Sequence, residues 1–238
     1  MNNNTWWFIS WYERILLKSQ NFIIVSNNCW GFESYKTLNR PYNTTFVGLY
    51  LYPADYLKLI YNFEKIFDEE LTFVTGSKFV EGELGYPVGI ILDDVEIHFL
   101  HYNSAHVAKN KWTRRLQRMK ESRSEGAKLL FKMCDRDGCT TEDLKLFHQA
   151  PVVKNHTRIS FGVKPLLDQH HIVVDEALSG QGDQSPDGLK LYQIRYQLFD
   201  FCHWVIHGRV RKSLGSRIFS LFSWPQKLVR IVFRWHVH

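Results

Sequence analysis

The chain lacks a long hydrophobic run. No segment reaches the roughly 18 to 20 uninterrupted apolar residues that a membrane-spanning helix needs. Its start, MNNNTWWFIS, lacks the cationic flank and continuous apolar stretch of a secretory signal. Four cysteines in 238 residues are also too few for the disulfide framework of a small secreted domain. From these absences we expect a protein that is neither integral nor exported and that works in a reducing, cytoplasmic compartment.

Acidic residues are missing from residues 201–238. This stretch carries seven lysines and arginines, so the net charge of +6 less these seven leaves −1 for residues 1–200. Because the body is almost neutral, nucleic-acid binding is disfavoured. Residues 209–238 mix their cations with aromatic and aliphatic residues around Pro225, a pattern typical of short amphipathic segments on an anionic membrane surface. The alternative is that they pack on the body as terminal core helices.

The chain also has no internal repeat and no low-complexity block. With 45% hydrophobic residues it can bury one sizeable core. We expect an N-terminal helix within residues 1–19, an α/β domain in residues 20–208 and a basic amphipathic tail in residues 209–238. A loop-rich segment at residues 178–188 separates the body from a last helix at residues 191–206.

Short apolar runs alternate with helical patterns along the body. This alternation predicts an α/β fold with a mostly parallel, Rossmann-like sheet, helices on both faces and an antiparallel hairpin that turns at Asp93 and Asp94. The strands are predicted at residues 21–25, 45–52, 71–74, 87–92, 95–102, 129–133, 157–161 and 172–174. The main helices are predicted at residues 33–38, 53–67 and 104–121, and after a capping box formed by Thr140 and Asp143.

The first strand ends in a polar turn, Asn-Asn-Cys-Trp-Gly, at residues 27–31. In open α/β sheets ligands bind beyond the carboxyl ends of the strands, so this turn is predicted to form half of a site. Cys29 would be a nucleophile if its position before a helix lowered its thiol pKa; the alternative is a small buried hydrophobe. The two asparagines would donate hydrogen bonds to a developing oxyanion, or serve only as turn residues. The predicted substrate-binding residues of the turn are Asn27, Asn28, Trp30 and Gly31.

A second polar turn follows the strand predicted at residues 129–133. Asp135 and Asp137 form the Asp-x-Asp pattern that many nucleotide-sugar glycosyltransferases use to hold a divalent metal such as Mg or Mn against a diphosphate. Arg136 would then reach a phosphate. Gly138 and Thr140 lie where the N–H groups of the next helix would bind an anion.

A third set of candidate residues lies on the strand predicted at residues 95–102. Glu96 and His98 share one face of an ideal strand, so the carboxylate could orient the imidazole for acid/base catalysis. The alternative is a half-exposed strand with its polar residues outward. A zinc site built on His98, His101 and His106 is disfavoured, because no matching Cys or His spacing occurs elsewhere.

Several longer motifs are similar to those of one bacterial family. They are IIVSNNCWG, the Pro-Tyr-Asn of residues 41–43, YPVGIILDDVEIHFLHY, the Lys-Trp-x-Arg-Arg of residues 111–115, and FKMCDRDGCT. The chain resembles, over roughly residues 20–205, uncharacterised proteins labelled as exopolysaccharide or capsular polysaccharide biosynthesis proteins. The resemblance implies a cytoplasmic role in building surface glycans beside glycosyltransferases and acyltransferases. Phe32 stands where the family usually has a second glycine after Gly31.

We therefore expect a transferase that acts on a surface polysaccharide precursor. The first possibility is glycosyl transfer from a nucleotide sugar with Mg or Mn. The second is acyl transfer from an acyl-CoA with Cys29 and His98 as catalytic residues, Glu96 assisting. The third is a non-catalytic, membrane-associated partner of glycan-assembly enzymes. The expected partners are the glycan precursor, the activated donor and, through residues 209–238, an anionic membrane surface.

Overall fold

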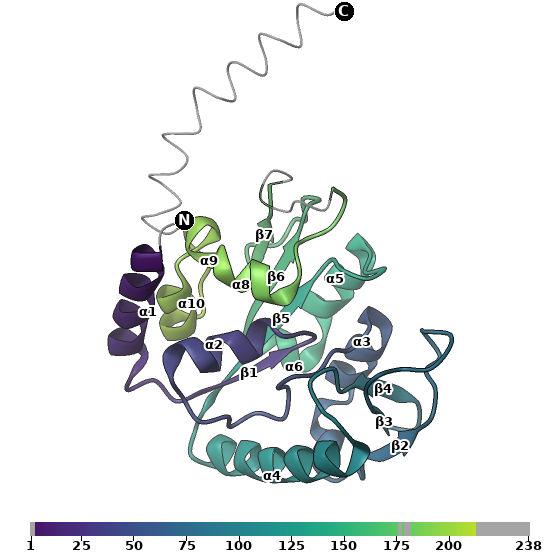
Figure 1. Cartoon of the computed structure of the whole chain (residues 1–238). Helices are drawn as coiled ribbons and strands as arrows, with labels where there is room; N and C mark the ends of the chain where they lie inside the picture. The colour runs from purple at the N-terminus through teal and green to yellow at the C-terminus, as the bar shows by residue number, and fades with distance from the viewer. Residues whose placement is uncertain (1–2, 176–177, 179–181, 213–238) are drawn as a thin grey trace, which may run out of the picture.

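The computed structural model describes residues 3–175, 178 and 182–212, which form two β-sheets among helices (Figure 1). The larger sheet is parallel, in the order β1-β5-β6-β7. Its strands are β1 (Phe22–Ser26), β5 (Lys128–Cys134), β6 (Thr157–Gly162) and β7 (His171–Val173). The smaller sheet is antiparallel, in the order β2-β3-β4, and consists of β2 (Thr72–Val74), β3 (Val88–Ile91) and β4 (Val95–His98). The predicted α/β fold is confirmed, and the predicted hairpin, β3 with β4, belongs to a sheet of its own.

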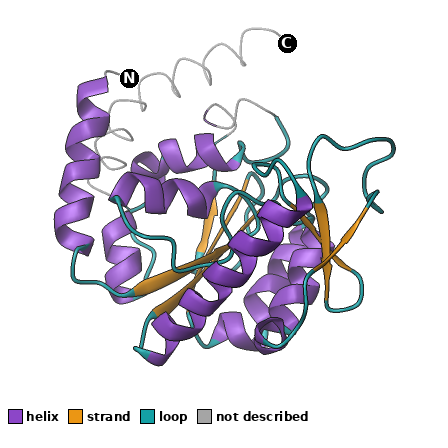
Figure 2. Cartoon of the chain, turned by 60° about the horizontal axis from the view of Figure 1, so that its bottom comes forward, coloured by secondary structure: helices purple, strands orange, loops and turns teal. Residues whose placement is uncertain are grey.

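Helices cover both faces of the parallel sheet (Figures 1 and 2). One face carries α1 (Asn3–Leu17), α2 (Trp30–Leu38), α8 (Gly188–Gln193), α9 (Arg195–Leu198) and α10 (Phe201–His207). The other face carries α3 (Pro53–Tyr61), the 3-10 helix η1 (Phe63–Phe67), α4 (Ala105–Ser124), α5 (Thr141–Gln149) and α6 (Pro151–Lys154). No helix among the described residues is both long and apolar enough to cross a membrane.

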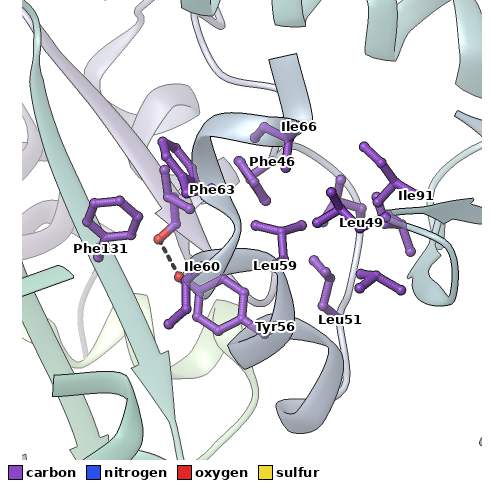
Figure 3. Packing of buried hydrophobic residues seen from close by; sticks show 14 of the residues in the cluster. Phe46, Leu49, Leu51, Tyr56, Leu59, Ile60, Phe63, Ile66, Ile91 and Phe131 are labelled. Atoms are coloured by element: carbon purple, nitrogen blue, oxygen red, sulfur yellow. Dashed lines mark hydrogen bonds between the residues drawn. The ribbon is translucent and has the colours of Figure 1, made fainter. Parts of the chain in front are cut away.

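The alternation of strand side chains divides the core in two. Ile23 and Val25 of β1 point into the cluster under α3 and α4, whereas Phe22 and Ile24 point into the cluster under α2 and α10. Figure 3 shows the first cluster, where Tyr56 of α3 donates its hydroxyl to the carbonyl oxygen of Val25 at 3.0 Å. Both faces of β1 are therefore buried, as is typical of strands in a parallel sheet.

The outer edge of β1 is covered by side chains instead of another strand. Asn43 donates its amide to the Phe22 carbonyl oxygen at 3.1 Å, and Thr44 donates its hydroxyl to the Ile24 carbonyl oxygen at 2.9 Å. The Ile24 N–H donates to the Tyr35 hydroxyl at 3.1 Å. Three outward backbone groups of β1, at Phe22 and Ile24, therefore have side-chain partners although the strand lies at the end of the sheet.

Four secondary-structure predictions are wrong in detail. The strand predicted at residues 95–102 ends at His98, as β4. The strand predicted at residues 45–52 is an extended segment that pairs through a single bridge, between Tyr50 and His98, and a left-handed Gly48 bends it. The helix predicted at residues 191–206 is divided into α8, α9 and α10, because Ile194 leaves the helix and Phe199 is extended. The helix predicted at residues 53–67 continues as η1 after Asn62.

Most of the predicted basic tail, residues 213–238, lies outside the described residues. Residues 209–212, at its beginning, are described. Val210 packs against the second core cluster, and Arg211 donates to the Asp200 carboxylate at 2.8 Å. The first residues of the tail thus belong to the body.

Candidate functional site

The two polar turns singled out in the sequence lie at the same edge of the parallel sheet. β1 and β5 are neighbours, with Ser26 opposite Lys132, and each turn follows the carboxyl end of its strand. The side-chain amide nitrogen of Asn28 donates to the Cys134 sulfur at 3.2 Å, and this hydrogen bond joins the ends of β1 and β5 directly. The candidate site is this carboxyl edge, where parallel α/β sheets bind their ligands.

Cys29 lies beside a histidine at this edge. It is the N-cap residue of α2, and its Sγ is 3.4 Å from Nε2 of His101. The His101 ring stacks on Phe32, and its backbone N–H donates to the Gly48 carbonyl oxygen at 3.2 Å. Gly48 has φ +70°, and a Cβ there would lie 3.2 Å from the Tyr102 ring. A glycine at residue 48 therefore lets the chain bring His101 to the thiol.

The thiol of Cys29 is not poised as a thiolate. Burial raises its pKa above the ordinary value, and the carboxylates of Glu33 and Asp187 raise it further against the opposing charge of Lys132. A neutral thiol needs a base to become a nucleophile, and His101 is in contact with it. The geometry therefore suits proton transfer from Sγ to Nε2 at the moment of attack.

The first turn of α2 supplies possible oxyanion donors next to Cys29. The Cys29 side chain makes no capping hydrogen bond, and the Trp30 N–H is taken by the Asn28 side-chain oxygen at 3.2 Å. The N–H groups of Gly31 and Phe32 are in the first helical turn, where no acceptor comes from the helix itself. Gly31 is also required for packing, because a Cβ there would lie 3.0 Å from Ile24.

Lys132 is a buried residue of this edge that the sequence did not single out. Its Nζ lies 3.0 Å from the Asn28 side-chain oxygen, 3.1 Å from the Cys134 sulfur and 3.4 Å from the Asn27 side-chain oxygen. Burial lowers its pKa, and Cys134 opposes this effect. The lysine is the central donor of a polar cluster inside the sheet edge. In the sequence, a lysine within an otherwise apolar strand was the feature that could have indicated this buried residue.

This cluster changes the interpretation of the two asparagines. Both are buried, and the side chain of Asn28 is in contact with Lys132, Cys134 and the Trp30 N–H. Its amide therefore holds the two strand ends together. The Asn27 side-chain nitrogen has no hydrogen-bond partner among the described residues, although the atom is buried.

Trp30 was predicted to bind substrate, and its location corrects that prediction. Its side chain is 0% exposed and packs edge to face against Tyr192, Phe201 and Trp204. Phe161 of β6 completes the cluster. An indole so placed stabilises the core between α2 and α10 and does not face a ligand.

Glu96 and His98 form a separate buried pair on β4. Their Oε2 and Nε2 atoms are 3.3 Å apart, without the geometry of a hydrogen bond. Glu96 instead accepts from the Ser77 hydroxyl at 2.6 Å and the Lys78 N–H at 2.7 Å. Burial lowers the pKa of His98, although Glu96 opposes it, so the imidazole is neutral. The imidazole in contact with Cys29 is that of His101, not of His98 as predicted.

Aromatic rings fill the space around the buried His98. Four of them surround the His98 imidazole: Tyr50, Tyr52, Phe79 and Tyr86. Burial raises the pKa of the Tyr50 phenol, and the carboxylate of Asp137 in the second polar turn raises it further. Tyr52 and Phe79 stack with centroids 4.2 Å apart.

The aspartates predicted to bind metal have other partners. The carboxylate of Asp135 accepts the N–H of Val163 at one oxygen and the N–H of Ser185 at the other, each at 2.7 Å. Asp137 has φ +57°, and its carboxylate is 3.6 Å from the Arg136 guanidinium. In the described part of the chain, no three His, Cys, Asp or Glu side chains are grouped to hold a metal ion. Asp135 thus fastens two loops to the end of β5.

The remaining predicted residues of the second turn shape the start of α5. Arg136 donates to the Ser185 carbonyl oxygen at 3.0 Å, and Thr140 forms the predicted capping box with Asp143. Gly138 has φ +84° and lines a pocket of about 620 Å³ in front of this helix. The other lining residues are Asp135, Cys139, Thr140, Thr141, Glu142, Leu144, Lys145, Lys164, Asp183 and Gln184.

The chain is similar to a protein family and to a bacterial protein. The family model described as "Domain of unknown function (DUF1919)" matches residues 2–177. A protein of Haemophilus influenzae (strain ATCC 51907 / DSM 11121 / KW20 / Rd), described as "Uncharacterized protein", is 35% identical over 215 residues. That match covers 87% of this chain and 95% of the Haemophilus protein. The family model thus spans both sheets and both polar turns.

Proposed function

This chain belongs to the DUF1919 family, and we propose that it is a transferase that acylates a surface polysaccharide precursor. The observation that supports acyl transfer is the contact between Cys29 and His101 at the start of α2, beyond the carboxyl end of β1. The choice of a polysaccharide precursor rests on the sequence motifs that resemble polysaccharide biosynthesis proteins. The two parts of the proposal are independent, and the experiments below test the acyl transfer.

The proposed reaction has two steps. The Cys29 sulfur attacks the carbonyl carbon of an acyl thioester while His101 accepts the thiol proton, and the departing thiol of the donor takes that proton. A hydroxyl group of the glycan then attacks the acyl-cysteine, with His101 accepting the hydroxyl proton and returning it to the Cys29 sulfur. The N–H groups of Gly31 and Phe32 would stabilise the negative charge on the carbonyl oxygen in both steps.

Glycosyl transfer, the first possibility from the sequence, becomes the second candidate, and the pocket in front of α5 supports it. Lys145 and Lys164 line this pocket, and a helix N-terminus with nearby cations suits a diphosphate. The metal-binding part of that hypothesis has less support, since both carboxylate oxygens of Asp135 accept backbone N–H groups. This balance favours acyl transfer.

Acyl transfer can be tested without knowledge of the acceptor. We expect the full-length protein incubated with short-chain and long-chain acyl-CoA donors to gain one acyl group at Cys29, as measured by intact mass and peptide mapping. His101→Ala should slow this acylation about 10²- to 10⁴-fold, the usual contribution of a general base. His106→Ala is the matched control, because this histidine is exposed and forms a hydrogen bond with Asn110 on the same helix, α4. Acylation that persists at the same rate in Cys29→Ala would refute the role of Cys29.

A ligand screen separates the three functions. A ligand present at about 100 times its dissociation constant stabilises the fold by roughly 2.7 kcal/mol, which a thermal shift detects. Stabilisation by acyl-CoA supports acyl transfer, and metal-dependent stabilisation by a nucleotide sugar supports glycosyl transfer. Stabilisation by neither supports a non-catalytic partner of glycan-assembly enzymes.

We also propose that the protein works at the inner face of the cytoplasmic membrane. Residues 209–238 carry seven cations and no acidic residue among their aromatic and aliphatic residues, which suits an anionic leaflet. Lipid-linked glycan precursors would be found at this surface.

A further inference from the structure

A second polar pocket lies at the opposite end of the parallel sheet. It has a volume of about 470 Å³ and is located where β5 and β6 begin, beside the end of α10. Its lining residues are Lys128, Leu129, Asn155, His156, Thr157, Gln169, His170, His207, Gly208 and Arg209. The site proposed for acyl transfer, at the carboxyl ends of the strands, uses none of them.

The lining is rich in hydrogen-bond donors and contains no carboxylate. Lys128 and Arg209 supply an ammonium and a guanidinium group, and among the described residues neither forms an ion pair with an Asp or Glu side chain. Lys128 donates to the carbonyl oxygen of Ile206 at 2.8 Å, which holds its ammonium beside the end of α10. Such a surface attracts anions.

A buried histidine in this pocket has an unsatisfied N–H group. The side-chain amide of Gln169 donates to Nε2 of His170 at 3.3 Å, so the proton of the neutral ring is on Nδ1. Nδ1 is buried and has no hydrogen-bond partner among the described residues, and the whole residue is only 8% exposed. Because solvent does not reach this nitrogen, His170 can report on the lining of the pocket but does not itself bind a ligand there.

The end of α10 brings the second fixed charge to the pocket. Gly208 is the C-cap residue, with φ +70°. A Cβ at this position would lie 3.0 Å from the Thr157 hydroxyl oxygen. A glycine therefore allows the chain to turn tightly against the start of β6 and to place Arg209 in the lining.

We propose that this pocket binds a phosphoryl group, with Arg209 and Lys128 as its donors. Guanidinium and ammonium groups form charge-assisted hydrogen bonds with phosphate oxygens, and a 470 Å³ pocket has room for the rest of a phosphate ester. The ester is either a soluble metabolite or the headgroup of a phospholipid. The pocket lies where residues 209–238 begin, so a lipid headgroup would be held beside the basic tail.

Titration with soluble phosphates tests the first source. The full-length protein is titrated with inorganic phosphate and with glycerol 3-phosphate at constant ionic strength, and ¹⁵N shifts of the histidine side chains are followed. We expect saturable shifts at His170. Arg209→Ala should weaken binding about tenfold or more, the effect of losing one hydrogen bond that involves a charged group. Lys212→Ala is the matched control, since it removes a cation three residues away that does not line the pocket.

Vesicles of phosphatidylglycerol and phosphatidylcholine test the second source. If soluble esters do not bind, vesicle binding that Arg209→Ala weakens about tenfold more than Lys212→Ala assigns the pocket to a lipid headgroup. If the two variants behave alike with both soluble esters and vesicles, the cations act only as a diffuse charge and the proposal is overturned.

Discussion

Replacing Glu13 should destabilise the protein more than replacing almost any other carboxylate. Glu13 of α1 and Arg195 of α9 form an ion pair between residues 5% and 0% exposed, with Arg195 Nε 3.2 Å from Glu13 Oε1 and a second, shorter contact beside it. Burial alone would lower the pKa of Arg195, but Tyr192 and Glu13 outweigh it and raise the pKa. Burial raises the pKa of Glu13 against the opposing charge of Arg195. The two-point contact with the guanidinium favours the charged carboxylate.

The structure sets the magnitude of this effect. Removing one member of a buried pair leaves the other charge without compensation, which costs about 3 to 5 kcal/mol. Glu13→Gln should lower the free energy of unfolding by this amount, a large share of the roughly 5 to 15 kcal/mol that holds a domain folded. The double variant Glu13→Gln with Arg195→Met should recover most of the loss, because a methionine would pack on the rings of Tyr192 and Phe201.

The assay is urea unfolding followed by circular dichroism, with the slope of the transition compared between variants. The matched control is Glu142→Gln, which breaks the exposed pair with Lys145 (2.9 Å) on the surface of α5. Exposed pairs of this kind contribute about 0 to 1 kcal/mol. If Glu13→Gln costs no more than Glu142→Gln, then the pair is not sealed from water and the reasoning fails.

Two further predictions concern the buried lysine and the basic tail. Because the pKa of Lys132 is lowered in the folded state, the unfolded state binds more protons between that pKa and the ordinary value of 10.5, so stability rises with pH over this range. The stability of Lys132→Met relative to the natural protein should therefore fall as pH rises toward 10.5 in urea unfolding, and a difference that does not change with pH would contradict the burial of a titrating amine. Deleting residues 213–238, which keeps the packed Val210 and the Arg211 ion pair, should leave a folded body that no longer sediments with anionic vesicles at low salt. Unfolding of this truncated chain, or a full-length chain that ignores such vesicles, would support the alternative that the tail packs as core helices.

The sequence predicted elements well where local patterns decide the structure. The apolar runs of β1 and β5, the Asp93 and Asp94 turn between β3 and β4, and the Thr140 capping box depend on neighbouring residues, and all are present. The segment at residues 45–52 has the composition of a strand but not the neighbours of one. It passes the edge of β1 where side chains occupy the hydrogen-bonding positions, so composition alone could not exclude a strand.

The partners of the site residues could not be predicted because they depend on contacts distant in sequence. β4 ends at His98, and the chain then turns, so the alternation rule that assigned faces to His98 and His101 no longer applied at His101. The strand ends that Lys132 bridges are separated by 104 residues along the chain. That both polar turns would meet at one edge did follow from the sequence, because parallel strands place their carboxyl ends together.

The side chains along the outer edge of β1 have a consequence for how this protein behaves at high concentration. An uncovered edge of a parallel sheet offers a row of donors and acceptors to any other chain, and apolar edge strands of this kind start aggregates. Here Asn43, Thr44 and Tyr35 occupy three of these groups, at Phe22 and Ile24, with hydrogen bonds of 2.9 to 3.1 Å. A second molecule would have to displace all three to add a strand. The most hydrophobic strand of the sheet can therefore end it without making the molecules adhere to one another.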